Sequence, residues 1–122
     1  MTRILVVAPT ETRRRLVNIL RQAGYAVAEA DSAQSALKTA RSLSPELILM
    51  AIVMPESNGL EVAANLRQHL NFELPPILLL GTITPIGIDE EPLASLVSGY
   101  LDIDVSSDDL LAAVQSHVTV TN

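Results

Sequence analysis

The sequence has 122 residues, which suits one domain with its own hydrophobic core. It contains no Cys, and this excludes disulfide bonds, thiolate catalysis and Cys-ligated metals. The net charge of −6 and the pI near 4.7 oppose nucleic-acid binding, because phosphate contacts need clustered Lys and Arg. The apolar runs are too short for a membrane span or a signal peptide, so we expect a cytoplasmic domain.

Five short apolar runs are predicted to form strands, the fifth being the weakest. They are residues 4–7, 25–28, 47–53, 77–80 and 100–103. The runs ILVV and ILLL contain no alternating polar residues. This pattern is typical of central strands in a parallel sheet that helices cover on both faces.

Segments with helical periodicity separate these runs. Apolar residues recur at spacings of three and four residues in four segments, which are therefore predicted to be helices. Two of them are 12–23 and 60–70. The other two start at Ala33, after a cap at Asp31 or Ser32, and after a cap at Ser106. The segment 81–92 breaks the pattern with Pro85, Gly87 and Pro92, because Pro and Gly disfavour a helix interior. There we expect a long loop followed by a short helix at 93–97.

The alternation of strands and helices predicts an α/β fold, a doubly wound five-stranded parallel sheet with about five helices. Such folds place ligands and chemistry at the carboxyl ends of the strands. The residues expected there are Ala8, Pro9, Thr10, those at 51–58, Gly81, Thr82 and those at 102–104. In the turn after the third strand, Asn58 and Gly59 suit left-handed conformations.

Four stretches of sequence carry a resemblance to a known family. In chain order they are RILVVAPTETRRRLVNILRQAGYAVAEADSAQSAL, SPELILMAIVMPESNGLEVAANLR, PPILLLGT and SGYLDIDVSSDDLLAAV. Together they resemble the receiver domain of two-component response regulators, which has a flavodoxin-like fold. The resemblance implies one receiver domain at 1–118, with 119–122 as a C-terminal tail or the start of a linker.

Receivers of this family take a phosphoryl group from a histidine kinase onto an Asp at the end of the third strand. An acidic pair after the first strand helps this Asp to hold Mg²⁺, a Thr or Ser after the fourth strand binds the phosphoryl group, and a Lys after the fifth strand pairs with it. Mg²⁺ needs hard oxygen ligands, and the transferring group needs positive charge around it.

All of these positions differ in this sequence. The resemblance aligns the acidic pair with Ala8 and Pro9, the Asp with Ala51, the Thr or Ser with Gly81, and the Lys with Ile103. It therefore implies a degenerate pseudo-receiver that lacks the phospho-accepting Asp, is not an enzyme, and needs no Mg²⁺ or other metal. We expect the former pocket to be rebuilt as core, because a Lys without its acidic partners would be an unpaired buried charge.

Other polar residues lie near the same strand ends but are expected to be solvated loop residues. They are Thr10, Glu11, Glu56, Ser57, Thr82, Asp102 and Asp104. On an extended segment Asp102 and Asp104 would share one face, yet two carboxylates alone make a weak cation site. The family has a cis-Pro after its Lys, whereas the bond from Ile103 to Asp104 is expected to be trans.

We expect a phosphorylation-independent module that binds other proteins in two-component-type signalling. We expect the partner to be another protein or an attached output or kinase domain, with a basic surface if charge guides docking. A homodimer through the fourth helix, fifth strand and fifth helix is an alternative. This face would carry Asp89, Glu90, Glu91, Tyr100, Asp102, Asp108 and Asp109. Tyr100 either takes part in the interaction or packs on its strand with its hydroxyl at the surface.

Two other functions remain open. An apolar cavity at the strand ends would make the domain a sensor of a small apolar ligand, whereas side chains that fill this space would exclude such a role. The other alternative is a receiver that is phosphorylated on a non-standard acceptor.

Overall fold

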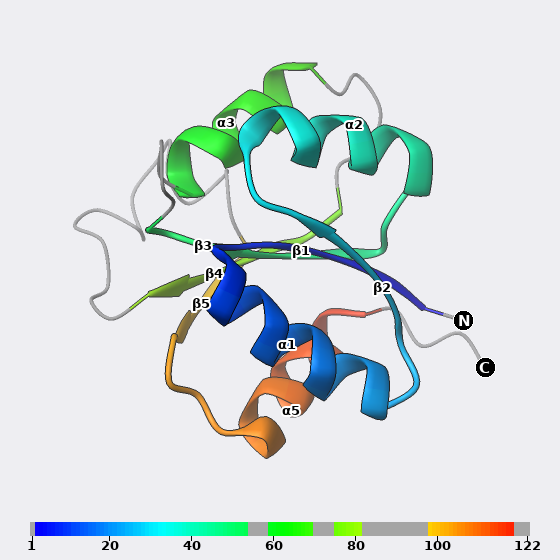
Figure 1. Ribbon diagram of the computed structural model, residues 1–122, viewed down its shortest axis with the longest axis vertical. Coiled ribbons are helices and arrows are strands. Elements are labelled where there is room, and N and C mark those ends of the chain that lie inside the picture. The colour runs from blue at the N-terminus through cyan, green and yellow to red at the C-terminus, as the bar shows by residue number, and fades with distance from the viewer. Residues whose placement is uncertain (1, 54–58, 70–74, 82–97, 119–122) are drawn as a thin grey trace.

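The computed structural model describes residues 2–53, 59–69, 75–81 and 98–118 of the chain (Figure 1). Its elements in chain order are β1 (Arg3–Val7), α1 (Thr10–Gln22), β2 (Ala26–Ala30), α2 (Ala33–Leu43), β3 (Leu47–Ala51), α3 (Gly59–His69), β4 (Ile77–Gly81), β5 (Gly99–Asp102) and α5 (Ser107–His117). The five strands form one sheet in the order β2-β1-β3-β4-β5, and all four neighbouring pairs are parallel.

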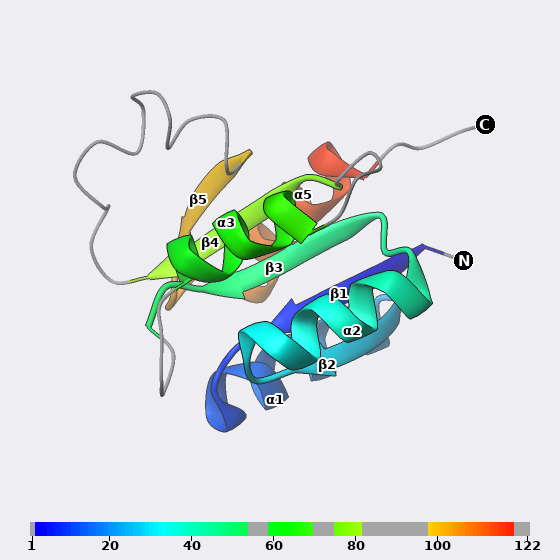
Figure 2. The same cartoon turned by 90° about the horizontal axis from the view of Figure 1, so that it is seen from above.

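The sheet lies between two layers of helices. Figure 1 shows α2 and α3 on one face of the sheet and α1 and α5 on the other. Figure 2, turned by 90°, shows α2 and α3 lying over the strands. This arrangement confirms the predicted doubly wound α/β fold, with four helices in the described part of the chain. None of these helices is long and apolar enough to cross a membrane.

The three central strands form the middle of the hydrophobic core. Every residue of β3 and β4 is buried, and so is every residue of β1 after Arg3. The outer strands β2 and β5 are mostly half-buried. Central strands contact helices on both faces, which explains why their sequences lack polar alternation.

Two serines cap helices as predicted. The Ser32 hydroxyl accepts a hydrogen bond from the backbone N–H of Ser35 at 3.1 Å, and the Ser35 hydroxyl accepts one from the Ser32 N–H. The Ser106 hydroxyl accepts from the N–H of Asp109 at 3.1 Å. These bonds satisfy N–H groups that have no partner inside the first turn of a helix.

Several predicted boundaries were wrong by a few residues. The third strand ends at Ala51, two residues earlier than predicted, although the Ile52 N–H still donates to the Leu80 carbonyl at 2.8 Å. The second strand runs from Ala26 to Ala30 and not over 25–28, and α1 begins at Thr10. The predicted loop at 81–92 after Gly81, and the short helix at 93–97, lie outside the described residues.

Gly59 has a different role from the one predicted. It belongs to the first turn of α3 and does not have a positive φ, whereas Gly24 after α1 does, at 97°. A Cβ atom at Gly59 would lie 2.5 Å from the carbonyl oxygen of Ala51. The position therefore needs glycine because two backbone segments approach each other closely.

Candidate functional site

The carboxyl ends of the central strands meet at one edge of the sheet, close to the loop after β5. In the sheet register Ala51 lies beside Leu80, and Gly81 lies beside Asp102. The backbone N–H of Ile103 donates to the Gly81 carbonyl at 2.8 Å, which continues this pairing beyond β5. The parallel topology thus brings together residues that are 21 to 29 positions apart in the sequence.

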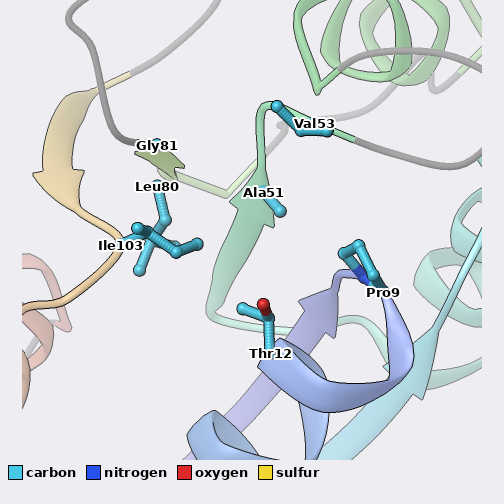
Figure 3. A pocket seen from close by; sticks show the side chains of 7 residues that line it. All are labelled: Pro9, Thr12, Ala51, Val53, Leu80, Gly81 and Ile103. Atoms are coloured by element: carbon cyan, nitrogen blue, oxygen red, sulfur yellow. The ribbon is translucent and has the colours of Figure 1, made fainter.

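A pocket with a volume of about 200 Å³ lies at this edge (Figure 3). The described residues that line it are Pro9, Thr12, Ala51, Val53, Leu80, Gly81 and Ile103. Four of the five positions predicted from the family resemblance are among them. The fifth, Ala8, is fully buried and belongs to the hydrophobic core.

The expectation that the former pocket is rebuilt as core holds only in part, because Ala8 and Ala51 belong to the hydrophobic core but a space remains between the strand ends. Ala51 and Gly81 are buried, but a methyl group and a hydrogen atom are too small to fill the space between the strand ends. The larger Ile103 is half-buried at the edge of the space and leaves it open. Val53 also lines the pocket, and it is 73% exposed. An exposed apolar side chain therefore stands beside an apolar recess.

Sequence reasoning missed Thr12 and Leu80 as lining residues, whereas Val53 belongs to the range 51–58 that was expected at this edge. Thr12 lies in the first turn of α1, and Figure 3 shows its hydroxyl directed toward the space bounded by Ala51 and Pro9. No hydrogen bond joins this hydroxyl to any other residue in the described part of the chain. Its place one turn into the helix that follows β1 was the signal that could have identified it, because such helices begin at the carboxyl edge of the sheet.

A family model described as "Response regulator receiver domain" matches residues 4–115. The chain belongs to this family of receiver domains. It is a receiver domain of two-component signalling, as the resemblance of its sequence implied. The five-stranded order 2-1-3-4-5 is the receiver topology.

Individual proteins agree with this assignment. The transcriptional regulatory protein LnrK of Bacillus subtilis is 34% identical over 97 residues, which cover 80% of this chain and 43% of LnrK. The hybrid signal transduction histidine kinase D of Dictyostelium discoideum is 29% identical over 117 residues, which cover 96% of this chain and 8% of the kinase. The chemotaxis protein CheY4 of Vibrio cholerae matches with a TM-score of 0.87 at 27% identity, covering 97% of this chain and 99% of CheY4.

This receiver domain spans less than half the length of those two curated relatives. In them the matching region is therefore part of a longer protein, a kinase in one case and a transcriptional regulator in the other.

The described lining of the pocket does not fit Mg²⁺. Mg²⁺ is bound by carboxylate oxygens and waters in near-octahedral geometry. The described residues that line the pocket supply no carboxylate, and their one side-chain oxygen is the hydroxyl of Thr12. Within the described ranges, no group of three or more His, Cys, Asp or Glu residues is placed to hold a metal ion.

The other polar residues considered from the sequence do not line the pocket in the part that is described. Thr10, Glu11, Asp102 and Asp104 are exposed. Glu56, Ser57 and Thr82 lie outside the described residues.

The segment after β5 is not extended, because the Val105 N–H donates to the Asp102 carbonyl in a turn. The Asp102 carboxylate accepts from the Asp104 N–H at 2.8 Å, so the two carboxylates do not form the shared face that was considered.

Tyr100 turns its hydroxyl inward, toward Gly81. The hydroxyl is buried and has no hydrogen-bond partner in the described part of the chain, so the surface position considered from the sequence was wrong. A Cβ at Gly81 would lie 3.2 Å from this oxygen and 2.9 Å from Cδ1 of Ile52. Burial raises the pKa of the phenol, and the negative charge of Asp102 raises it further. The phenol is therefore neutral at physiological pH.

Two arginines of α1 hold the loops on either side of the pocket. The guanidinium of Arg13 donates to the Ala8 carbonyl at 2.9 Å and pairs with Glu29 at 3.0 Å. The guanidinium of Arg15 donates to the Ile103 carbonyl at 3.1 Å and also to the Val105 carbonyl. Arg15 thus fixes a turn that lies 88 to 90 residues further along the chain.

Replacing Arg15 with Met should lower the free energy of unfolding by about 1.5–3 kcal/mol, the net contribution of a hydrogen bond from a charged group. Met keeps the aliphatic length of the side chain, so the loss reports on the guanidinium. Urea unfolding measures the effect, and Arg14→Met on an exposed position of the same helix is the control. Equal stabilities of the two variants would contradict the role given to Arg15.

Proposed function

We propose that this receiver domain acts as a phosphorylation-independent module that binds other proteins in two-component-type signalling. The observation that carries the proposal is Ala51, which stands at the end of β3 on the wall of the pocket. In the family this is the place of the phospho-accepting Asp, and Ala51 has no side-chain oxygen. We infer that the domain is not an enzyme and needs no Mg²⁺.

The rest of the pocket supports the same inference. Phosphoryl transfer needs a nucleophile and positive charge on the transferring group. Among the described lining residues there is neither a carboxylate nor a cationic side chain. The hydroxyl of Thr12 lacks an adjacent general base in this set, so it is a poor nucleophile.

The surface around β5 and α5 supports a role in binding. Asp102, Asp104, Asp108 and Asp109 are all exposed within eight residues. Asp89, Glu90 and Glu91, which the sequence places on the same face, lie outside the described residues. We propose that this acidic surface docks a basic partner protein, an attached output or kinase domain, or a second copy of the chain, and that the domain works in the cytoplasm without contacting nucleic acid or membrane.

A single experiment separates the two parts of this proposal. The tagged protein is incubated with a native cell extract, with and without acetyl phosphate and Mg²⁺, and the captured proteins are compared. The same samples are weighed by intact-mass spectrometry. We expect the mass to stay unchanged and the captured set to be the same in both conditions. A stoichiometric phosphoryl adduct would show instead that the domain uses a non-standard acceptor.

The binding surface is tested with the double variant Asp104→Lys/Asp108→Lys. No hydrogen bond of either carboxylate is found in the described structure, so the change acts mainly on surface charge. We expect capture of the partner to fall at least tenfold. The matched control is Glu11→Lys/Asp31→Lys, which reverses two exposed charges elsewhere. Equal capture of the partner by both double variants would show that the acidic surface does not bind it.

A further inference from the structure

The described part of the lining of the pocket at the strand ends is almost entirely apolar. Its described lining consists of aliphatic and proline side chains, a glycine and the methyl-bearing side chain of Thr12. An ion that entered it would lose water and find no opposite charge among the described lining residues, which costs far more than transferring a neutral molecule. The lining therefore selects neutral ligands over phosphate or other anions.

The volume limits the size of such a ligand. The pocket measures about 200 Å³, somewhat more than an engineered apolar cavity of about 150 Å³ that stays dry and binds benzene. A single aromatic ring with one small substituent fits this space. A larger ligand would have to extend past Val53, which stands 73% exposed at the edge.

Among the described lining residues, one side chain carries a polar group that could orient a bound ligand. The hydroxyl of Thr12 faces the space from α1, and no bond to the rest of the described chain uses it (Figure 3). A hydroxyl can both donate and accept, so it would orient a ligand that carries one hydrogen-bonding substituent. A few placed polar groups in an apolar lining are the usual composition of a small-molecule site.

We propose that the pocket bounded by Thr12, Ala51 and Ile103 binds a small neutral ligand, an aromatic ring or similar apolar body with one hydrogen-bonding substituent directed at Thr12. The ligand would contact the start of α1, the ends of β3 and β4, and the turn after β5. Arg15 already joins α1 to that turn through the carbonyls of Ile103 and Val105. Occupancy would tighten the edge of the sheet that borders the acidic surface.

The proposal goes beyond the protein-binding function and is tested separately from it. Phenol, benzene and inorganic phosphate are titrated into the ¹⁵N-labelled protein, and backbone amide shifts are followed by NMR. We expect phenol and benzene to shift the amides of Thr12, Ala51, Gly81 and Ile103, with dissociation constants on the order of a millimolar for ligands of this size. Phosphate is expected to leave these amides unshifted, and shifts with phosphate at the same sites would overturn the proposal.

Ala51→Leu places a larger apolar side chain in the pocket and should reduce the affinity for both aromatic probes at least tenfold. Ala64→Leu makes the same change on the exposed side of α3 and should leave both affinities unchanged. Because Ala51 is buried, Ala51→Leu could fail to fold, and a second variant is therefore needed. Val53→Asp puts a charge at the exposed edge and should also weaken the binding of both probes. Wild-type affinity in a folded Ala51→Leu or Val53→Asp protein would show that the probes bind elsewhere.

Thr12→Val removes the hydroxyl and keeps the shape of the side chain. We expect the affinity for phenol to fall about three- to tenfold and that for benzene to stay the same, because only phenol forms the hydrogen bond. Thr39→Val on α2 is the matched control. An equal effect on both probes would refute the role of the hydroxyl. Phosphorylation and partner capture do not enter these readouts, so either proposal can fail without the other.

Discussion

Replacing Ala51 with Asp is expected to lower the free energy of unfolding by about 2–4 kcal/mol at pH 7 and not to create a phosphorylation site. Ala51 is 2% exposed and is flanked in the pocket by Leu80, Gly81 and Ile103. A carboxylate at this position would lose water and would find no cationic side chain among the described lining residues. Both the destabilisation and the lack of activity follow from the surroundings of residue 51.

The effect should depend on pH in a defined direction. Desolvation raises the pKa of the new carboxyl in the folded state above its value of about 3.9 in the unfolded chain. The penalty is therefore full above the folded-state pKa, and it disappears as the pH falls toward the unfolded-state value. Urea unfolding should show that the free energies of unfolding of the variant and of the parent protein differ less at pH 4.5 than at pH 7.

Ala51→Asn is the matched control for this prediction, because it has the same shape without the charge. At pH 7 it should lower the free energy of unfolding by less than Ala51→Asp does. Its difference in stability from the parent protein should be the same at pH 7 and at pH 4.5. Incubation of Ala51→Asp with Mg²⁺ and beryllofluoride should give no bound fluoride signal in ¹⁹F NMR. Stoichiometric binding would mean that the missing Asp alone had inactivated the pocket.

Replacing Gly59 with Ala is expected to lower the free energy of unfolding by about 2–4 kcal/mol, as overpacking against backbone does at its upper range. The new Cβ would lie 2.5 Å from the Ala51 oxygen and 3.1 Å from the Cα of Ile52. The Gly59 N–H also donates to the Ile52 carbonyl at 2.7 Å, so α3 cannot withdraw without losing this bond. Backbone atoms cannot rotate away as a flexible side chain would.

The comparison for this variant is Gly24→Ala. Gly24 has a φ of 97° and nothing within 4 Å of an added Cβ, so this change tests conformational strain alone, at about 1 kcal/mol. Chemical denaturation of both variants separates the two causes. If Gly59→Ala proved no worse than Gly24→Ala, the close approach between β3 and α3 would not be a constraint.

The sequence predicted the fold well because the signals for it are local. ILVV and ILLL lack polar alternation, which indicates strands covered on both faces, and β1 and β4 are indeed buried. Ser32 and Ser106 were predicted as caps, and both accept the expected hydrogen bonds. Errors arose at the ends of elements, where one or two residues of the same run lie in a turn.

The sequence by itself determined which residue types stand at the carboxyl edge of the sheet, since alternating strands and helices fix that edge. It placed Pro9, Ala51, Gly81 and Ile103 there, and all four line one pocket. The tertiary structure decided whether they fill the space. Their packing leaves about 200 Å³ open, adds Thr12 to the lining, and brings Arg15 across to the turn after β5. Volume and reach depend on how helices and strands pack in three dimensions, which no local pattern in the sequence encodes.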